Sequence, residues 1–525
     1  MHRLSCTTFL IVVFMMLTQN GRMLVAQSFP LRPGRASDGG RYGQFFDKGG
    51  MVFNVRAFGA KGDGKTDDSS SIFAATKAAA SAHGTLYFPQ GVYIIKSPWN
   101  LTAITGLRIE GAGPSSGPTG ISGVATELLY KGSALPSECP YDLTSSTWVS
   151  ISDITLDSVP PTACTLLLGS ATSGGSKDLE FKHDVFQRAV VATVADAGAE
   201  SLMFSDCDIV YGPGRGLLLS SNGLVGYGIS SAFGYKYVPH SMTQVTYRGG
   251  EIVTVGQGRG VELDGTGLGT VLTCSDLTFF GVFFQGTGSG NAAFYVKGAA
   301  WALLIYGARY EVDAQTGTCY FLRAAPGAKI SDLEITGFDG GSTNGQGIDC
   351  LYSSPGARAE IGNGVVYGID TPIVWDGSLY GIDFRSGSVD DISVTGDVVH
   401  CSFRARHGLG TFHVTGRLFA DVEDYKNVVE LEYLRSGSSS YTFNAANSPI
   451  GHYTASFASD FCSLDFTKAF RTDFIVLNVN RVNAQAAFAN SHLGHITCPA
   501  AGPSKRVRIT ASFSGTPNWF VVRVN

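Results

Sequence analysis

The chain has 525 residues, with 38 lysines and arginines against 43 aspartates and glutamates and an isoelectric point near 6.1. This balance provides no basic surface that could displace counterions from a nucleic acid, so we expect no nucleic-acid partner. Glycine accounts for 67 residues, hydrophobic residues for 44% and charged residues for only 15%. Such a composition is typical of an ordered chain with many short strands joined by tight turns.

Residues 1–26 have the features of a secretory signal: a basic start, an apolar stretch from Leu10 to Leu17 and a small-residue exit at Ala26. That stretch is shorter than the roughly 18 apolar residues that span a membrane, and no later segment reaches this length. We therefore expect a secreted, periplasmic or cell-surface protein without a membrane partner. Residues 27–50 carry glycine and mixed charge without periodicity, which predicts a linker or arm.

The cysteines are scattered singly along the chain. Of the 10 cysteines, Cys6 lies inside the predicted signal, and none of the others forms a CxxC pair. Isolated cysteines on apolar strands are usually buried small hydrophobic residues, and export would permit a few disulfides. We therefore expect core cysteines and no metal site.

A helix is predicted near the start of the folded part. Thr66, Asp67 and Asp68 offer capping oxygens and negative charge to the first N–H groups of a helix. Gly84 provides a stop. Between them, helical spacing gathers the apolar face on Ile72, Ala75, Thr76 and Ala79.

The segments NVRAFGAKGDGKTDDSSSI and GTLYFPQGVYII, within residues 54–95, resemble the opening signature of the pectate-lyase-like superfamily. This superfamily includes polygalacturonase relatives and phage tailspikes. The resemblance implies a right-handed parallel β-helix whose N-terminal end is capped by a helix. The NTD and RIK motifs of polygalacturonases are missing from the chain, so the resemblance concerns the scaffold and implies no pectin substrate.

A repeated pattern supports the same fold class. Five stretches can be written in one register, with starts 23, 43, 32 and 26 residues apart: LEFKHDVF from Leu179, LMFSDCDI from Leu202, VTYRGGEI from Val245, LTFFGVFF from Leu277 and LLIYGARY from Leu303. Weaker copies begin at Leu333 and Ile392. A period of roughly 20–30 residues predicts a solenoid of stacked coils. We therefore expect an all-β, right-handed parallel β-helix over residues 51–435, with an extra coil left open in the longest gap.

After Ser436 the pattern changes to alternating strands such as HYTASFASDF and KRVRITASF. Alternation of this kind predicts a small C-terminal antiparallel β module over residues 436–525. Such ends resemble trimerisation or sugar-binding modules of tailspike-like proteins, which leaves a homotrimer open.

Stacked coils bring residues from distant parts of the chain together. Equivalent positions in successive coils lie about 4.7–4.9 Å apart, so the register places Asp208, Glu251 and, past Phe283, Arg309 in one column. Asp206 shares a column with His183. Neighbouring carboxyls raise one pKa, which can create a general acid and a general base, and we therefore predict Asp206, Asp208 and Glu251 as catalytic. The alternative is that acids at coil corners only cap turns.

Candidate substrate-binding residues lie around these acids. Alternation places Arg309, Glu311 and Asp313 on one side of GARYEVD, where a simple surface ion pair is the alternative. Tyr211, Tyr247 and Arg248 offer flat rings and a forked donor to sugars, unless the rings pack in the core.

The leading functional hypothesis is a secreted polysaccharide-degrading enzyme that works in a groove along the β-helix. Hydrolysis needs two carboxyl groups, whereas elimination from a uronic acid needs a base and a positive group or cation. The residues leave both a glycoside hydrolase and a polysaccharide lyase open. No cofactor is required, and Ca²⁺ is left open only for a lyase. The alternatives are a non-catalytic carbohydrate-binding or adhesion protein and a structural spike on the same scaffold.

Overall fold

The computed structural model contains one described unit, within residues 50–525. The described ranges are 50–114, 125–169, 176–187, 191–194, 200–212, 215–220, 242–266, 274–313, 317–342, 348–367, 373–386 and 389–405, followed by the backbone of further strands as far as residue 524. The predicted signal and almost all of the predicted arm lie outside these residues. Within the described ranges, no helix is long and apolar enough to cross a membrane.

The N-terminal end carries the predicted helix. A short 3-10 helix, η1 (Val55–Phe58), precedes α2 (Ser69–Ser81), which buries Ile72, Ala75, Thr76 and Ala79 as expected. Capping differs in detail: Asp67 accepts from the backbone and hydroxyl of Ser69, whereas Asp68 accepts from the N–H groups of Lys61 and Gly62. Asp68 therefore fixes the preceding turn and does not cap the helix by its side chain.

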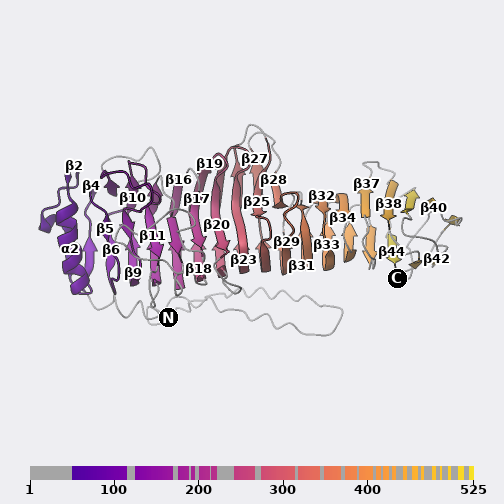
Figure 1. The fold of residues 1–525 in the computed structure, drawn as a ribbon, viewed down its shortest axis with the longest axis horizontal. Helices are drawn as coiled ribbons and strands as arrows, with labels where there is room; N and C mark the ends of the chain where they lie inside the picture. The colour runs from indigo at the N-terminus through magenta and orange to yellow at the C-terminus, as the bar shows by residue number, and fades with distance from the viewer. Residues whose placement is uncertain are drawn as a thin grey trace, which may run out of the picture. The chain divides into compact units, whose positions relative to one another are not determined.

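Three parallel sheets, A, B and C, run through successive coils, and from β3 to β28 the strands follow in this order along the chain (Figure 1). Strand β23 (Ala292–Tyr306) runs unbroken from sheet C into sheet A. Sheet B contains β2 (Asp63–Asp67), β4 (Gly91–Ile95), β7 (Thr126–Tyr130), β10 (Thr155–Ser158), β13 (Val185–Gln187), β16 (Asp208–Gly212), β19 (Glu251–Val255), β22 (Phe283–Thr287), β24 (Arg309–Val312) and β27 (Asp339–Ser342).

The other two sheets continue beyond the last strand of sheet B. Sheet A contains β1 (Val52–Asn54), β3 (Thr85–Tyr87), β6 (Arg108–Glu110), β9 (Thr147–Ser152), β12 (Lys177–Lys182), β15 (Glu200–Ser205), β18 (Met242–Arg248), β21 (Cys274–Phe280), the second half of β23, β26 (Lys329–Thr336), β29 (Ala359–Tyr367), β31 (Gly377–Ser386), β33 (Val398–Ala405) and β35 (Leu418–Asp424). Sheet C contains β5 (Trp99–Asn100), β8 (Tyr141–Asp142), β11 (Leu166–Gly169), β14 (Val191–Val194), β17 (Arg215–Ser220), β20 (Arg259–Gly265), the first half of β23, β25 (Cys319–Ala324), β28 (Ile348–Ser353), β30 (Ile373–Trp375), β32 (Val389–Val394) and β34 (Leu409–Val414).

The predicted register of the five stretches is confirmed. Leu179 pairs with Leu202, Leu202 with Val245, Val245 with Leu277 and Leu277 with Leu303. Because β15 pairs directly with β18, the long gap after Asp208 is an insertion into one coil and hides no extra coil. The prediction that a weaker copy in the same register begins at Ile392 is wrong. Ile392 belongs to β32 in sheet C, where it pairs with Ile373. In the described part of the chain, later coils have no strand in sheet B, and this shortens the repeat.

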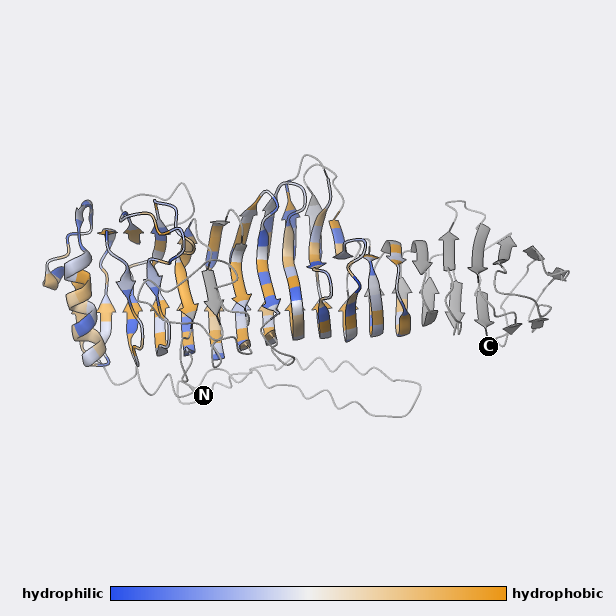
Figure 2. Ribbon diagram, in the orientation of Figure 1, coloured by the Kyte–Doolittle hydropathy of each residue, from blue (hydrophilic) through white to orange (hydrophobic). Residues whose placement is uncertain are grey.

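The core is a column of side chains that point inward from each coil. Hydrophobic and polar positions alternate along the strands in Figure 2. Phe181, Phe204, Tyr247 and Phe279 stack in successive coils, with ring centroids 4.9, 5.3 and 6.3 Å apart. Stacked rings at this spacing add attraction beyond burial of their apolar area.

A tight corner joins sheet A to sheet B. From β9 to β27, two residues connect the strands at each corner, as in His183–Asp184 and Asp206–Cys207. His183 and Asp206 have φ of 54° and 52°, a left-handed backbone that polar residues and glycine tolerate better than β-branched ones. Gly281 and Gly307 hold the same place in later coils, with φ of 62° and 60°.

Strand pairing changes near the C-terminus. Beyond sheets A and C, the paired strands are β36 (Val429–Glu432), β37 (Tyr441–Ala445), β38 (His452–Ala458), β39 (Ser463–Asp465), β40 (Val476–Asn480), β41 (Gln485–Ala487), β42 (His495–Thr497), β43 (Arg506–Ser512) and β44 (Phe520–Val524). Most of these pairings are antiparallel, whereas β36 and β44 pair in parallel. A separate module over residues 436–525 stays a prediction.

The described cysteines lie in the interior. Cys207, Cys274, Cys319, Cys350 and Cys401 are buried. The disulfide, which the sequence left open, joins Cys139 to Cys164, 25 residues apart.

Replacing a ring of the inner stack should destabilise the protein strongly. Phe204→Ala removes a fully buried ring between Phe181 and Tyr247, so we expect a loss of about 3–5 kcal/mol in the free energy of unfolding. The adjacent Met203 points outward and is 43% exposed, so Met203→Ala should change it by no more than about 0.5 kcal/mol. Urea unfolding measures both; equal losses would contradict the inward and outward assignment.

Candidate functional site

The three predicted catalytic carboxylates lie where sheet A turns into sheet B. Asp208 and Glu251 open β16 and β19, and the register then passes through Phe283 to Arg309. Asp206 occupies the corner, where its Oδ2 lies 3.9 Å from Nε2 of His183. Both predicted columns are therefore confirmed, whereas the catalytic role of these residues stays a prediction.

Asp208 and Glu251 influence each other electrostatically. Oδ1 of Asp208 accepts a 2.9 Å hydrogen bond from the backbone N–H of Glu251. Burial raises the pKa of Asp208, and the charge of Asp206 adds to this effect. Burial also raises the pKa of Glu251, with the charges of Asp208 and Glu311 adding to it. The pair can hold a proton more readily than isolated carboxyls.

The neighbouring charged residues form surface ion pairs. Arg309 donates to Glu311, and its Nε lies 3.9 Å from Oδ2 of Asp339. The side chains of Arg309 and Asp339 are 59% and 78% exposed, so these pairs contribute little to stability. Asp313 directly follows β24 and is also exposed. The predicted grouping of Arg309, Glu311 and Asp313 is therefore placed on the surface, and its role in binding is untested.

The prediction that Tyr247 binds the substrate is wrong. Its ring is fully buried between Phe204 and Phe279, and its hydroxyl donates to the carbonyl of Cys207 at 2.7 Å. Alternation along β18 turns its neighbour Arg248 outward instead. The side chain of Tyr211 lies outside the described residues.

A second group of candidate functional side chains, which sequence reasoning missed, lies on the outer face of sheet C. The longest connection between the described coils adjoins this sheet: 21 residues separate Ser220 of β17 from Met242 of β18. From β9 to β27, the corners between sheets A and B contain only two residues.

Two ion pairs with buried carboxylates lie on this face. Glu262 is 1% exposed and its Oε2 lies 2.7 Å from Nη1 of Arg259. Asp264 is fully buried and its Oδ2 lies 2.9 Å from Nζ of Lys297. Removal of a carboxylate charge from water is expensive, and the cations remain 31% and 38% exposed, so these pairs are weak evidence for stability.

Arg323 lies among three tyrosines. Its Cζ is 5.2 Å from the ring centroid of Tyr320, 5.8 Å from that of Tyr352 and 5.9 Å from that of Tyr295. Tyr320 and Tyr352 stack with centroids 4.1 Å apart. Arg323 forms no ion pair with any carboxylate of the described residues, whereas Arg259 on the same face does. The rings thus orient the guanidinium, whose charge remains available to bind an anion.

Asp349 completes this group. It pairs in register with Tyr320, while Tyr352 pairs with Arg323. Burial raises the pKa of Asp349 to about 6. Burial also raises the pKa of Tyr320 to about 12, with Tyr352 adding and Arg323 opposing. A carboxyl group with a pKa of about 6 can act as a base at neutral pH, and a phenol that stays protonated can act as an acid.

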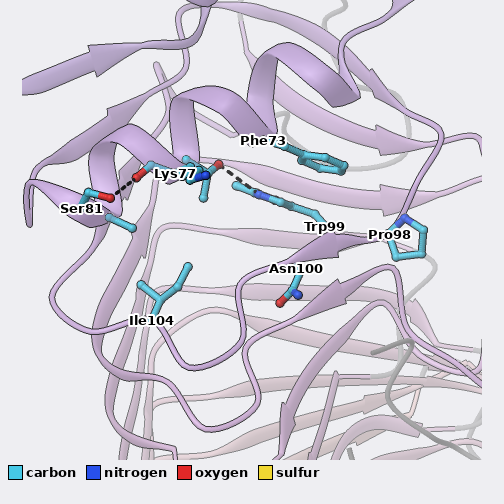
Figure 3. Close-up of a pocket in the computed structure, with 9 residues that line it drawn as sticks. Phe73, Lys77, Ser81, Pro98, Trp99, Asn100 and Ile104 are labelled. Atoms are coloured by element: carbon cyan, nitrogen blue, oxygen red, sulfur yellow. Dashed lines mark hydrogen bonds between the residues drawn. The ribbon is translucent and has the colours of Figure 1, made fainter. Parts of the chain in front are cut away.

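A pocket of about 400 Å³ lies elsewhere, between α2 and β5 at the N-terminal cap (Figure 3). Its lining is mostly apolar, including Phe73, Pro98, Trp99 and Ile104, with Lys77 as its charged side chain. It contains no carboxylate and therefore no acid–base pair. No group of three or more possible metal ligands occurs among the residues that the structure describes.

The comparisons with known proteins agree with the fold. Residues 52–211 match a family model described as rhamnogalacturonase A/epimerase, pectate lyase-like. The chain is 41% identical over 71 residues to an exopolygalacturonase of Arabidopsis thaliana, covering 14% of each protein. It is 59% identical over 44 residues to alginate lyase 7 of Azotobacter vinelandii, covering 8% of this chain and 5% of that protein. The chain thus spans only a small part of these relatives.

Among solved structures, the surface adhesin PfbA of Streptococcus pneumoniae is 12% identical, with a TM-score of 0.40. The match covers 76% of this chain and 98% of that one.

Neutralising Asp208 should lower the pKa of Glu251. Asp208→Asn keeps an oxygen that can accept the Glu251 N–H but removes a negative charge that raises the Glu251 pKa. Titration of Glu251 by NMR measures the shift. Asp339→Asn is the control, because Asp339 is not among the charges that act on Glu251. An unchanged Glu251 pKa in Asp208→Asn would show that the two carboxyls are not coupled.

Proposed function

Because this chain belongs to the pectate-lyase-like superfamily, we propose that it is an extracellular enzyme that modifies a uronate-containing polysaccharide on the outer face of sheet C. The observation that carries the proposal is the cationic Arg323, held among three tyrosine rings, one of which, Tyr320, lies in register with Asp349. Arginine binds carboxylates through a planar fork, so a sugar carboxylate is its natural partner. The relatives named as a polygalacturonase and an alginate lyase support a uronate substrate.

The proposed reaction begins with removal of the proton next to the sugar carboxylate. Asp349 accepts this proton as its O–H bond forms and the C–H bond breaks. The electron pair is delocalised onto the carboxylate, where the positive charge of Arg323 stabilises it. Two outcomes follow: elimination of the glycosidic oxygen cleaves the chain, or return of a proton from the opposite side inverts the carbon.

Tyr320 is the proposed proton donor. Its raised pKa keeps the hydroxyl protonated near neutral pH, and it lies in register with Asp349. In elimination, its proton passes to the departing sugar oxygen; in epimerisation, water supplies the proton from the side of the sugar opposite Asp349. Neither route requires a resident cofactor, and Ca²⁺ binding by a substrate carboxylate stays open. Export through residues 1–26 is part of the proposal.

A second candidate is hydrolysis at the corner between sheets A and B. The raised pKa of both Asp208 and Glu251 favours it, because a glycosidase needs two carboxyls of different protonation. Product analysis separates the candidates: elimination yields an ultraviolet-absorbing double bond, whereas hydrolysis yields reducing ends alone. A polysaccharide that binds without either product and without inversion of a sugar carbon would favour the adhesion alternative. The comparisons do not support a trimeric spike.

Removal of the Arg323 charge should impair the reaction. We expect Arg323→Gln to lower kcat/KM on polygalacturonate or alginate by about 100-fold or more, since it removes charge stabilisation in the transition state. Arg309→Gln is the matched control, an exposed arginine on sheet B, and should change it less than about twofold. An equal loss of kcat/KM in both variants, or a loss in Arg309→Gln alone, would indicate that the site lies on sheet B.

Asp349 should set the acidic limb of the pH profile. Activity should rise through about pH 6 as Asp349 loses its proton, and Asp349→Asn should abolish activity. The folded-state pKa lies above the ordinary value of 3.8, so between these values the folded chain binds more protons than the unfolded chain. The stability contributed by this carboxyl therefore falls as pH rises through that window.

Above pH 6, Asp349→Asn should consequently be at least as stable as the original protein while inactive. Thermal unfolding and initial rates across pH 4–8 measure both properties. If Asp349→Asn were active and the acidic limb of its pH–activity profile unchanged, Asp349 would have no role in the mechanism.

A further inference from the structure

We propose that the outer face of sheet A is a second carbohydrate-binding surface, which takes a neutral polysaccharide chain. The surface is formed by the rings of Phe280, Trp301 and Tyr306, here called the aromatic platform. Phe280 and Trp301 are 54% and 55% exposed, among the most exposed large hydrophobic side chains of the described residues. This surface is separate from the Arg323 group and does not depend on the reaction proposed there.

Strand register places the three rings on one face. Phe280 ends β21 and pairs with Tyr306, which ends β23 in the next coil. Trp301 lies on β23 as well, in register with Ser275 of β21. Because neighbouring parallel strands are about 4.8 Å apart, Phe280 and Tyr306 are direct neighbours, while Trp301 lies five residues before Tyr306 on the same strand. A flat aromatic face suits the apolar face of a pyranose ring.

The polar edges of two rings are already held by the following strand. Nε1 of Trp301 donates to the carboxylate of Asp332, and the hydroxyl of Tyr306 donates to Oε2 of Glu334 at 3.0 Å. Asp332 and Glu334 both belong to β26, one coil further along sheet A. These bonds fix the direction of the rings, so little side-chain freedom remains to be lost when a sugar stacks on them.

The charges around the platform select against an acidic chain. Two carboxylates, Asp332 and Glu334, border the rings, while Arg248 is the cation beside them, 6.0 Å from the Phe280 ring. Carboxylate oxygens with remaining lone pairs accept hydrogen bonds from sugar hydroxyls but repel sugar carboxylates. The occupant that fits is therefore a neutral glycan, in contrast to the uronate expected at Arg323.

Affinity electrophoresis of the full chain tests this inference with two probes, soluble mixed-linkage β-glucan and soluble β-galactan, and with polygalacturonate as the acidic comparison. We expect retardation of the original protein by at least one neutral probe. Trp301→Ala and Phe280→Ala should each weaken that retardation by about fivefold or more, because each removes one stacking ring. Their kcat/KM on the acidic substrate should be unchanged.

Met203→Ala is the matched control, since Met203 is an exposed apolar residue of the same sheet without a ring. Its retardation should equal that of the original protein. Thermal unfolding confirms that the variants are folded, as expected for exposed positions. Arg323→Gln should retain binding to the neutral probe, which separates a failure of this inference from a failure of the proposed reaction.

Three results would overturn the inference. The first is the absence of retardation by both neutral probes. The second is retardation that Trp301→Ala and Phe280→Ala leave unchanged. The third is a self-interface, recognised when sedimentation shows an oligomer that Trp301→Ala dissociates, because the platform would then be covered by a second copy of the chain.

Discussion

Parallel hydrogen bonding between successive coils, in a fixed register, is the constraint on which the rest of the structure depends. A shift by one residue would turn every inward side chain outward. The inner stack of Phe181, Phe204, Tyr247 and Phe279 opposes such a shift, because these rings find equivalent partners only in register. The corner backbone acts in the same direction: Asp206, Gly281 and Gly307 hold left-handed conformations at the same step of each coil.

The same constraint gives each outer face its own chemistry. On sheet B it gathers the carboxyls of Asp208 and Glu251; on sheet A it aligns exposed rings. On sheet C it places Asp349 beside Tyr320 and Tyr352 beside Arg323, although these partners are 29 residues apart in the chain. Burial then changes the acidity of these groups, so a surface of ordinary residues acquires a base and an acid suited to neutral pH.

Much of the fold could be predicted from the sequence, because apolar alternation and the capping signals act locally. The stacking of Leu179, Leu202 and Val245 follows from that alternation, as does the helix at Ser69–Ser81. Tyr247 was mistaken for a sugar contact because its inward direction depends on the strand pleat. The sequence did not indicate the Arg323 group, because inward and outward residues do not alternate regularly along strands β25 and β28. Residues three apart, such as Tyr320 and Arg323, face outward together. Only pairing across coils reveals their neighbours.

The central claim is that the register creates a uronate site on sheet C. A crystal structure of the Asp349→Asn variant with a bound oligogalacturonate tests this claim most directly. The account predicts a sugar carboxylate on the guanidinium of Arg323, with the ring beside Tyr320. An oligosaccharide bound instead along Asp208 and Glu251, with Arg323 unoccupied, would contradict it.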